Sequence, residues 1–301
     1  MSSESNAKPE TTDQNPFHLG TAATNGHANL IELLLEEPNI NINEADERGR
    51  TPLILAASNG HAEVVELLLE YQPPVGDRLK SKAAVNQQSL DGFTALRAAL
   101  SGDHAAVAEV LLREEDIDVT REYRENWTPL GAASVAGHLK VVKAIVRKLV
   151  RKNKTEALHV KHRAESLEGT PLFLAADGGH TKVVNLLLQH HDPIPQKKLQ
   201  QINETNNGGR TALLAAATNG HVDVVALLLA EDADATIQSG EGMTALKAAI
   251  LGGHVGVVKL LFEKNKSSLP APKNTEKGAK EAYPEEKEES EKRQEKKEVT
   301  E

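Results

Sequence analysis

The sequence predicts an all-α protein, a solenoid of stacked helix–turn–helix repeats with hairpin loops between them. The first observation is a Thr-Pro-Leu or Thr-Ala-Leu tripeptide that recurs at Thr51, Thr94, Thr128, Thr170, Thr211 and Thr244. The second is that a His follows each of these Thr residues ten places later, with an Ala-Ala pair between the two. Because one helix pair cannot bury its apolar face alone, such units become stable by stacking on their neighbours.

A seventh copy precedes these six and lacks only the Thr. It begins at Phe17 and keeps Ala22-Ala23 and Gly26-His27. From Phe17 onward the starts of the copies are 34, 43, 34, 42, 41 and 33 residues apart. The base unit is therefore 33 or 34 residues long, and three units carry about eight to ten additional residues.

Residue types within each unit predict two short helices. The Thr hydroxyl can cap the first helix, and a proline, which needs no N–H at the first helical position, follows it at Pro52, Pro129 and Pro171. This helix is rich in Ala, so the backbone of a neighbouring helix can come close. A Gly, which readily adopts the left-handed backbone conformation, is expected to end the helix. The second helix has apolar residues at helical spacing, as in Val64, Val65, Leu68 and Leu69.

The motif Thr-Pro-Leu-x-x-Ala-Ala-x-x-Gly-His-x-x-Val-Val-x-Leu-Leu-Leu resembles the ankyrin repeat, and the match runs from Phe17 to about Lys266. The His that this family has after Thr-Pro-Leu is absent. The turn glycine is displaced in Gly102-Asp103-His104, and the turn before Thr170 has lost one residue. We expect these departures to reduce local stability and to leave the fold intact. The resemblance implies an ankyrin-type α-solenoid.

Three regions follow from this pattern. We expect residues 1–16 to be a disordered N-terminus, residues 17–266 to form the repeat solenoid, and residues 267–301 to be a charged disordered tail. Residues 269–301 contain eight Lys or Arg and ten Glu but almost no large apolar side chain, so this segment cannot offset its ordering entropy. The terminal units, Phe17–Glu37 and Met243–Lys266, are candidates for caps with a wetter outer face.

Composition excludes several function classes. The chain has no cysteine, which excludes a disulfide scaffold, a thiolate metal site and a cysteine nucleophile. No apolar run approaches the roughly 18 residues needed to cross a bilayer, and the polar start of the chain does not resemble a secretory signal. No P-loop, hydrolase elbow, dinucleotide fingerprint or metalloprotease helix is present. We therefore expect no enzyme activity, no cofactor and no small-molecule substrate.

The recurrent His residues are predicted to be structural. One His per unit, at a fixed place, is separated from the next by the helix–helix spacing of about 10 Å. A shared metal ion would need ligands at about 2 Å. The pair His190-His191 has only Asp192 beside it as a further ligand, so no metal site is expected there either.

The resemblance places partner binding along the hairpin tips and the adjoining face of the first helices. Trp and Arg dominate the energetics of interfaces, and large or charged residues occupy the variable positions of this surface. The candidates are Arg48, Arg50, Phe93, Arg124, Trp127, Arg210 and Met243. We expect Phe93, Trp127 and Met243 to face outward. The alternative is that Phe93 and Trp127 merely pack on the adjacent hairpin.

A second candidate surface lies in the fourth repeat. Residues 139–163 contain nine Lys or Arg against the single acid Glu156, and apolar residues interleave at helical spacing. We expect the second helix of this repeat to be extended, with a basic outer stripe formed by Lys140, Lys143, Arg147, Lys148, Arg151, Lys152 and Lys154. The stripe could dock an acidic protein segment, act as a nuclear-import patch, contact anionic lipid or nucleic acid, or be a solvated helix end.

The three insertions lie near Gln72–Ala84, Asn153–Arg163 and Gln189–Gln200. Long loops in compact arrays are often functional, although surface length variation is also tolerated. Their role and that of the tail stay open.

The function that the resemblance implies is a non-catalytic scaffold or adaptor that binds a protein partner. We expect a monomer located in the cytoplasm, with the nucleus as the alternative. The competing hypothesis is a nuclear or membrane-surface regulator that binds polyanions through residues 139–163, and an enzyme or metal protein is the third class. Net charge is −9, which argues against general nucleic-acid binding.

Overall fold

The computed structural model describes residues 17–37, 40–73, 82–120, 127–164, 167–190 and 194–268. The chain divides into two units, Met1–Leu261 and Phe262–Glu301. The repeats lie in the first unit, and the described part of the second, residues 262–268, is helical. The predicted disordered N-terminus, residues 1–16, lies outside the described residues. So do Arg124 and all of the predicted tail except residues 267 and 268. None of the described helices is long and apolar enough to cross a membrane.

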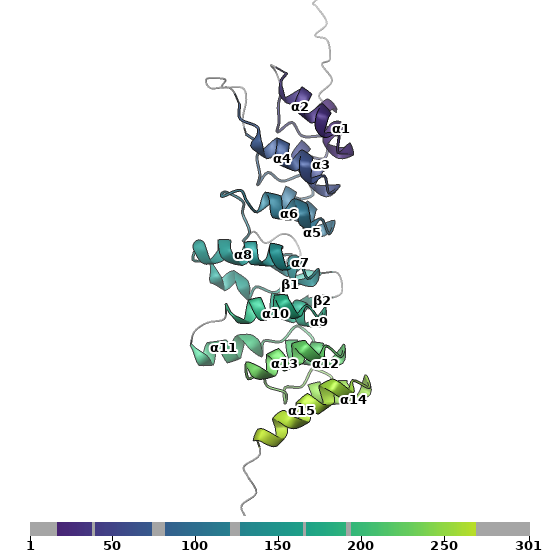
Figure 1. The fold of residues 1–301 in the computed structure, drawn as a ribbon, viewed down its shortest axis with the longest axis vertical. Coiled ribbons are helices and arrows are strands. Elements are labelled where there is room, and N and C mark those ends of the chain that lie inside the picture. Colours follow the sequence, from purple (N-terminus) through teal and green to yellow (C-terminus); the bar gives the residue numbers. More distant parts are fainter. Residues whose placement is uncertain are drawn as a thin grey trace, which may run out of the picture. The chain divides into compact units, whose positions relative to one another are not determined.

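Seven helix pairs follow one another along the chain (Figure 1). They are α1 (Phe17–Asn25) with α2 (Ala28–Leu35), α3 (Pro52–Ser58) with α4 (Ala62–Glu70), α5 (Ala95–Ser101) with α6 (Ala105–Leu111), α7 (Pro129–Val135) with α8 (Leu139–Arg151), α9 (Pro171–Asp177) with α10 (Thr181–Leu188), α12 (Ala212–Thr218) with α13 (Val222–Ala230), and α14 (Ala245–Leu251) with α15 (Val255–Ser268).

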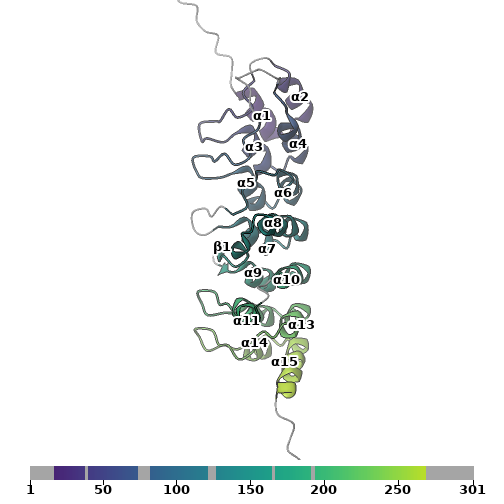
Figure 2. The same cartoon turned by 90° about the vertical axis from the view of Figure 1, so that its left-hand side faces the viewer.

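Each first helix packs on the first helices of the neighbouring pairs, and the second helices form a parallel row from α2 to α13. The hairpin loops project from the side of the first helices (Figure 2). The predicted all-α solenoid is confirmed. The additional elements lie in or next to insertions: the short helix η2 (Thr155–Leu158), the helix α11 (Pro195–Ile202), and the antiparallel strands β1 (His162–Ala164) and β2 (Leu167–Gly169), of which β2 directly precedes Thr170.

The predicted caps are present on six first helices. In each, the Thr hydroxyl accepts the backbone N–H of the residue three places on, at 3.1–3.3 Å. Proline occupies the first turn of α3, α7 and α9. The local sequence therefore fixes where each first helix begins, before any tertiary contact is made.

Close approach between repeats explains the small residues. One Ala occupies the same place in every first helix and is almost fully buried, at Ala22, Ala56, Ala99, Ala133, Ala175, Ala216 and Ala249. At the end of α3, Gly60 has φ +78°, and a Cβ there would lie 2.7 Å from Nδ1 of His104 in the next repeat. In the third repeat the displaced glycine leaves Asp103 in the left-handed conformation, with φ 60°.

The recurrent His residues have the structural hydrogen-bonding role that was predicted, and six of them link successive repeats. Five of them donate from Nε2 to a backbone carbonyl two residues before the turn glycine of the preceding repeat, for example His61 to Thr24 at 2.9 Å and His221 to Asp177 at 2.9 Å. His138 instead contacts the Asp103 carboxylate at 2.6 Å. Within the described ranges no group of three His, Cys, Asp or Glu could hold a metal ion.

Asparagines form a second link, between the loops that follow the second helices. Asn43 accepts the N–H of Ala84 at 2.7 Å and donates to the carbonyl of Lys82 at 2.8 Å. Asn86 makes the equivalent pair of bonds to Asp118 and Asp116 at 2.9 and 2.8 Å. These bonds satisfy backbone groups that a loop would otherwise leave to water.

The last repeat departs from the expected wet cap. Lys247 is exposed, but so are Ile250 and Leu251, at 55% and 70%. The residues equivalent to Ile250 in the earlier repeats are all buried. Within residues 17–268 as described, no further repeat packs on α14, and Ile250 is left exposed.

The fourth-repeat insertion enters the protein core. Gly131 in α7 has no side chain, and a Cβ placed on it would lie 2.2 Å from the Cβ of His162. The His162 side chain therefore fills the space beside Gly131, which we call the Gly131 slot. The Thr128 N–H donates to Nδ1 of His162 at 2.8 Å. His162 is 1% exposed, and its burial lowers its pKa to about 4.

Of the other insertions, residues 74–81 lie outside the described ranges, and α11 is ion-paired through Lys198 to Glu231.

Acid is expected to destabilise the array through His162. The folded pKa of about 4 lies below the usual value of about 6.5 in an unfolded chain. The unfolded state therefore binds more protons between these two pH values, and stability falls as pH falls through this window. Full loss would be about 3 kcal/mol. Urea unfolding of the wild type and His162→Asn between pH 7 and 4 checks this, and equal pH slopes for the two proteins would contradict it.

Removing one hydroxyl is expected to stabilise the array. Ser134 in α7 is fully buried and its Oγ has no hydrogen-bond partner in the described part of the chain, while the equivalent residues Ala57 and Ala176 are buried alanines. Because an unsatisfied buried hydroxyl costs free energy, Ser134→Ala should raise the unfolding free energy by about 1 kcal/mol. Ser58 is the matched control, since its hydroxyl donates to the carbonyl of Ile54 at 2.8 Å. A gain in Ser58→Ala but none in Ser134→Ala would refute the assignment.

Candidate functional site

The candidate binding residues lie in the loops that precede the first helices. We define the hairpin ridge as these loops together with the adjoining face of the first helices (Figure 2). Backbone hydrogen bonds join neighbouring loops, from Leu90 N–H to the carbonyl of Arg48 at 2.8 Å and from Gly240 N–H to that of Gly208 at 2.9 Å. The loops therefore hold one another in place.

The expectation that the large residues of the ridge face outward is wrong in part. Arg48 is exposed, but Phe93, Trp127 and Met243 are each partly buried. Phe93 and Trp127 pack against the hydrophobic core. The close stacking of repeats is the reason, since a large ring at the start of one first helix reaches the neighbouring repeat. The rings thus present only part of their surface to a partner.

An arginine that the sequence reasoning missed joins the two aromatic residues. The Arg97 guanidinium lies 4.4 Å from the centroid of the Phe93 ring and 5.5 Å from that of Trp127. Both distances are within cation–π range. The sequence contains one signal for this role: Arg97 is a charged residue at the position where other repeats have the apolar Ile54, Phe173 or Leu214. We call Phe93, Arg97 and Trp127 the aromatic cluster.

Two of the predicted arginines are held by acids. Arg50 contacts the Asp46 carboxylate at 2.7 Å through Nη2 and 2.8 Å through Nε. Burial opposes ionisation of Asp46, but the bonds from Arg50 and from the Arg48 N–H hold its pKa below the usual value. Arg210 lies 3.6 Å from Asp177 and 5.9 Å from the ring centroid of Phe173. These pairs fix the loops and leave less charge for a partner.

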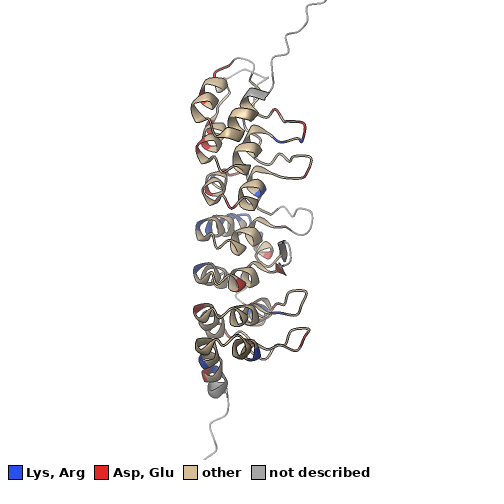
Figure 3. Cartoon of the chain, turned by 90° about the vertical axis from the view of Figure 1, so that its right-hand side faces the viewer, with Lys and Arg blue, Asp and Glu red and all other residues tan. Residues whose placement is uncertain are grey.

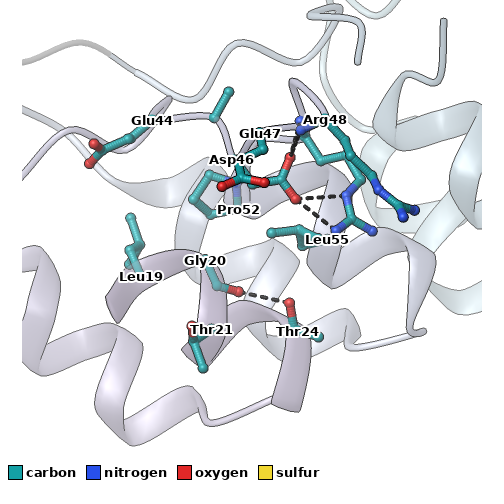
Figure 4. A pocket seen from close by; sticks show the side chains of 12 residues that line it. Leu19, Gly20, Thr21, Thr24, Glu44, Asp46, Glu47, Arg48, Pro52 and Leu55 are labelled. Atoms are coloured by element: carbon teal, nitrogen blue, oxygen red, sulfur yellow. Dashed lines mark hydrogen bonds and ion pairs between the residues drawn. The ribbon is translucent and has the colours of Figure 1, made fainter. Parts of the chain in front are cut away.

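Two grooves lie at equivalent places on the ridge, each between one first helix and the next hairpin loop. The larger, of about 630 Å³, is lined by residues that include Leu19, Thr21, Glu44, Glu47 and Leu55 (Figure 4). The second, of about 340 Å³, has Leu214, Met243 and Leu251 in its lining. Both volumes suit a group of side chains from a partner. Between the two grooves, Leu90 is 76% exposed at its loop tip.

The basic stripe is only partly where it was expected. Helix α8 is extended, as predicted, to 13 residues, and parts of its ribbon carry the blue of Lys and Arg (Figure 3). Lys148, however, is 8% exposed, and its Nζ donates to the carbonyl of Glu114 at 2.6 Å. Burial, with Lys152 and Arg151 nearby, lowers its pKa. Lys148 belongs to the junction between repeats three and four.

Other cations of the stripe also contact the third repeat. Lys152 donates to the carbonyl of Ile117 at 3.4 Å and Lys154 to the Thr120 hydroxyl at 3.4 Å. Lys140 lies 3.8 Å from Glu109, and Arg151 lies 3.6 Å from Glu115. Lys143 and Arg147 are exposed. The cluster therefore ties the third and fourth repeats together as well as charging the surface.

Comparison with known proteins was made at three levels. A family profile described as ankyrin repeats (3 copies) matches residues 3–78, 75–156, 144–239 and 194–273. The crystal structure of the human ASB11 ankyrin repeat domain superposes with a TM-score of 0.55 at 22% identity, over 80% of this chain and 96% of that one. This likeness supports the fold alone.

Three curated relatives share the repeat region. Human transient receptor potential cation channel subfamily A member 1 is 23% identical over 72% of this chain and 18% of its own length. The Caenorhabditis elegans ankyrin repeat and KH domain-containing protein mask-1 is 35% identical over 46% and 6%. The rice (Oryza sativa subsp. japonica) probable E3 ubiquitin-protein ligase XBOS32 is 30% identical over 48% and 32%. This chain thus matches less than a third of the length of each relative.

The motif, the capped helix pairs and the family profile agree over most of the sequence. The profile regions together run from residue 3 to residue 273, and they include all seven helix pairs. This chain belongs to the ankyrin-repeat family.

Proposed function

We propose that the chain is a non-catalytic scaffold or adaptor that binds a protein partner through the hairpin ridge. The aromatic cluster is the observation that carries the proposal. It places a tryptophan, a phenylalanine and an arginine together at the middle of the ridge. Tryptophan and arginine are residue types that dominate binding energy, and phenylalanine is enriched at the cores of interfaces. Leu90, 76% exposed on the loop before α5, adds apolar surface nearby.

Preorganisation supports the same function. The loops are joined by backbone hydrogen bonds, and Arg50 and Arg210 are already held by Asp46 and Asp177. A partner therefore loses little free energy in ordering this surface, which is the main cost that weakens flexible interfaces. The relatives combine the same repeats with a channel, a KH domain or a probable ligase, and binding is the role that the shared repeats can serve in such different proteins.

The polyanion hypothesis is the weaker alternative. Residues 139–163 carry a strong positive charge, but Lys148, Lys152 and Lys154 donate to groups of the third repeat. Lys140 and Arg151 are ion-paired, so among the described residues Lys143 and Arg147 are the exposed stripe cations that have no partner within the chain. Few phosphate contacts give weak, shallowly salt-dependent binding.

Truncation of the central ring tests the proposed site. Trp127→Ala should weaken a partner by about 2 kcal/mol, which is close to 30-fold in Kd. Partners are first identified by affinity purification with mass spectrometry, comparing the intact chain with the Phe93→Ala/Trp127→Ala variant in cytoplasmic and nuclear extracts. The Kd of each purified partner is then measured by calorimetry.

Leu199→Ala in α11 is the control, because Leu199 is 38% exposed and lies off the ridge. Circular dichroism must show that both variants keep their helices, since Trp127 also packs against the core. Unchanged affinity of a folded Trp127→Ala protein would place the site elsewhere.

Salt dependence tests the alternative. If only Lys143 and Arg147, the exposed stripe cations without an ion pair or hydrogen bond among the described residues, meet the polyanion, the slope of log K against log salt for heparin should be no steeper than about −2. Lys143→Glu/Arg147→Glu should remove what binding there is, and Lys259→Glu outside the stripe should not. A slope near −6 would show that the whole stripe binds the polyanion and would restore that hypothesis.

A further inference from the structure

The slot beside Gly131 distinguishes the fourth repeat from the other five capped ones. Gly131 is the third helical residue after its Thr cap, where the other capped repeats have Ile54, Arg97, Phe173, Leu214 and Lys247. His162 fills the space, and a Cβ on Gly131 would lie 2.2–2.7 Å from three of its side-chain atoms. His162 comes from the insertion, 34 residues after Thr128 in the sequence.

His162 also completes the helix cap. A side chain at the third helical position can accept the N–H of the capping residue, but Gly131 has none to offer. Nδ1 of His162 accepts that N–H from Thr128 at 2.8 Å instead. Without it, a buried backbone N–H next to Trp127 would lose its partner, at a cost of about 1–3 kcal/mol.

The same imidazole touches the tryptophan of the ridge. The ring centroids of His162 and Trp127 lie 5.8 Å apart with their planes at 60°, a tilted arrangement of the kind that aromatic pairs favour. Arg97 lies 5.5 Å from the Trp127 centroid. Trp127 is therefore bounded by one residue of the third repeat and one residue of the insertion.

We infer that His162 is a positioning residue for Trp127: seated in the Gly131 slot, it fixes the Trp127 ring in the hairpin ridge and makes the fourth-repeat insertion part of the recognition surface. This inference rests on the proposed function, because the ring needs a fixed orientation only if a partner reads it. It assigns a role to Asn153–Arg163, which the sequence left open.

The charged groups on the elements around His162 bear on any pH response of Trp127 in acid, and Arg163, which follows His162 in the chain, is one of them. Helix α7 carries no ionisable side chain. On the paired strand, Glu168 accepts a hydrogen bond from Asn207. Lys161 precedes His162 in the chain, and Arg97 lies on the far repeat beside Trp127.

The test uses fluorescence, because Trp127 is the only tryptophan in the chain and reports on its own site without a partner. The full chain is compared with His162→Ala and His162→Asn. In His162→Ala the ring should sample exposed orientations, so acrylamide quenching should rise about twofold and anisotropy should fall. In His162→Asn the amide oxygen can replace Nδ1 as the acceptor, and quenching should return most of the way to the wild-type value.

Leu158→Ala is the matched structural control, because Leu158 is a buried residue of the same insertion, 5% exposed, and its truncation leaves His162 in place. It should lower the melting temperature with little change in quenching. Quenching and anisotropy that stay at wild-type values in a folded His162→Ala protein would overturn the inference, as would a Leu158→Ala protein that changes them equally.

A pH titration of the wild type covers the case in which His162→Ala does not fold. Trp127 emission should change with a midpoint near pH 4, where His162 takes up its proton, and the change should be absent in His162→Asn. A transition that both proteins share would overturn the inference. Because no partner is used, these outcomes are independent of the Trp127→Ala binding result that tests the proposed function.

Discussion

Stacking at close range is the constraint on which the other features depend. Short first helices meet across a face of buried alanines, such as Ala56 and Ala216, and the turn after each helix must leave room for an imidazole from the next repeat. At Gly60 and Gly179 even a Cβ would collide with that ring. Each repeat is therefore shaped by its neighbour, and the regular spacing of the loops on the hairpin ridge is a result of this packing.

The repeat architecture could be predicted from the sequence because its determinants are local. A Thr such as Thr51 caps its own helix, a proline such as Pro52 fixes the first turn, and a glycine such as Gly60 ends it. Each signal repeats in register, so the copies support one another. A structural role for the recurrent His residues was also predictable, since one His per repeat at a fixed place meets a similar environment in most repeats.

The candidate site was less predictable, because contacts between repeats depend on which pairs of residues meet. Trp127 was identified, but not that Arg97 and His162 would lie against it. Lys148 was assigned to an exposed stripe, although the extended helix α8 turns it toward the carbonyl of Glu114. An amphipathic pattern distinguishes apolar from charged positions. A lysine at the edge of the apolar face can nevertheless be buried where its ammonium group donates to a backbone carbonyl of the neighbouring repeat.

The pairing of Gly131 with His162 has a consequence for how such an array can change in length. The insertion and the glycine depend on each other, since a shorter loop would leave a void in α7 and a larger residue at position 131 would expel the loop. A viable shortening would have to alter both places at once, for instance by excising the loop while replacing the glycine with an aliphatic residue. Protein engineers who wish to give every repeat the same length should therefore replace the insertion and Gly131 together.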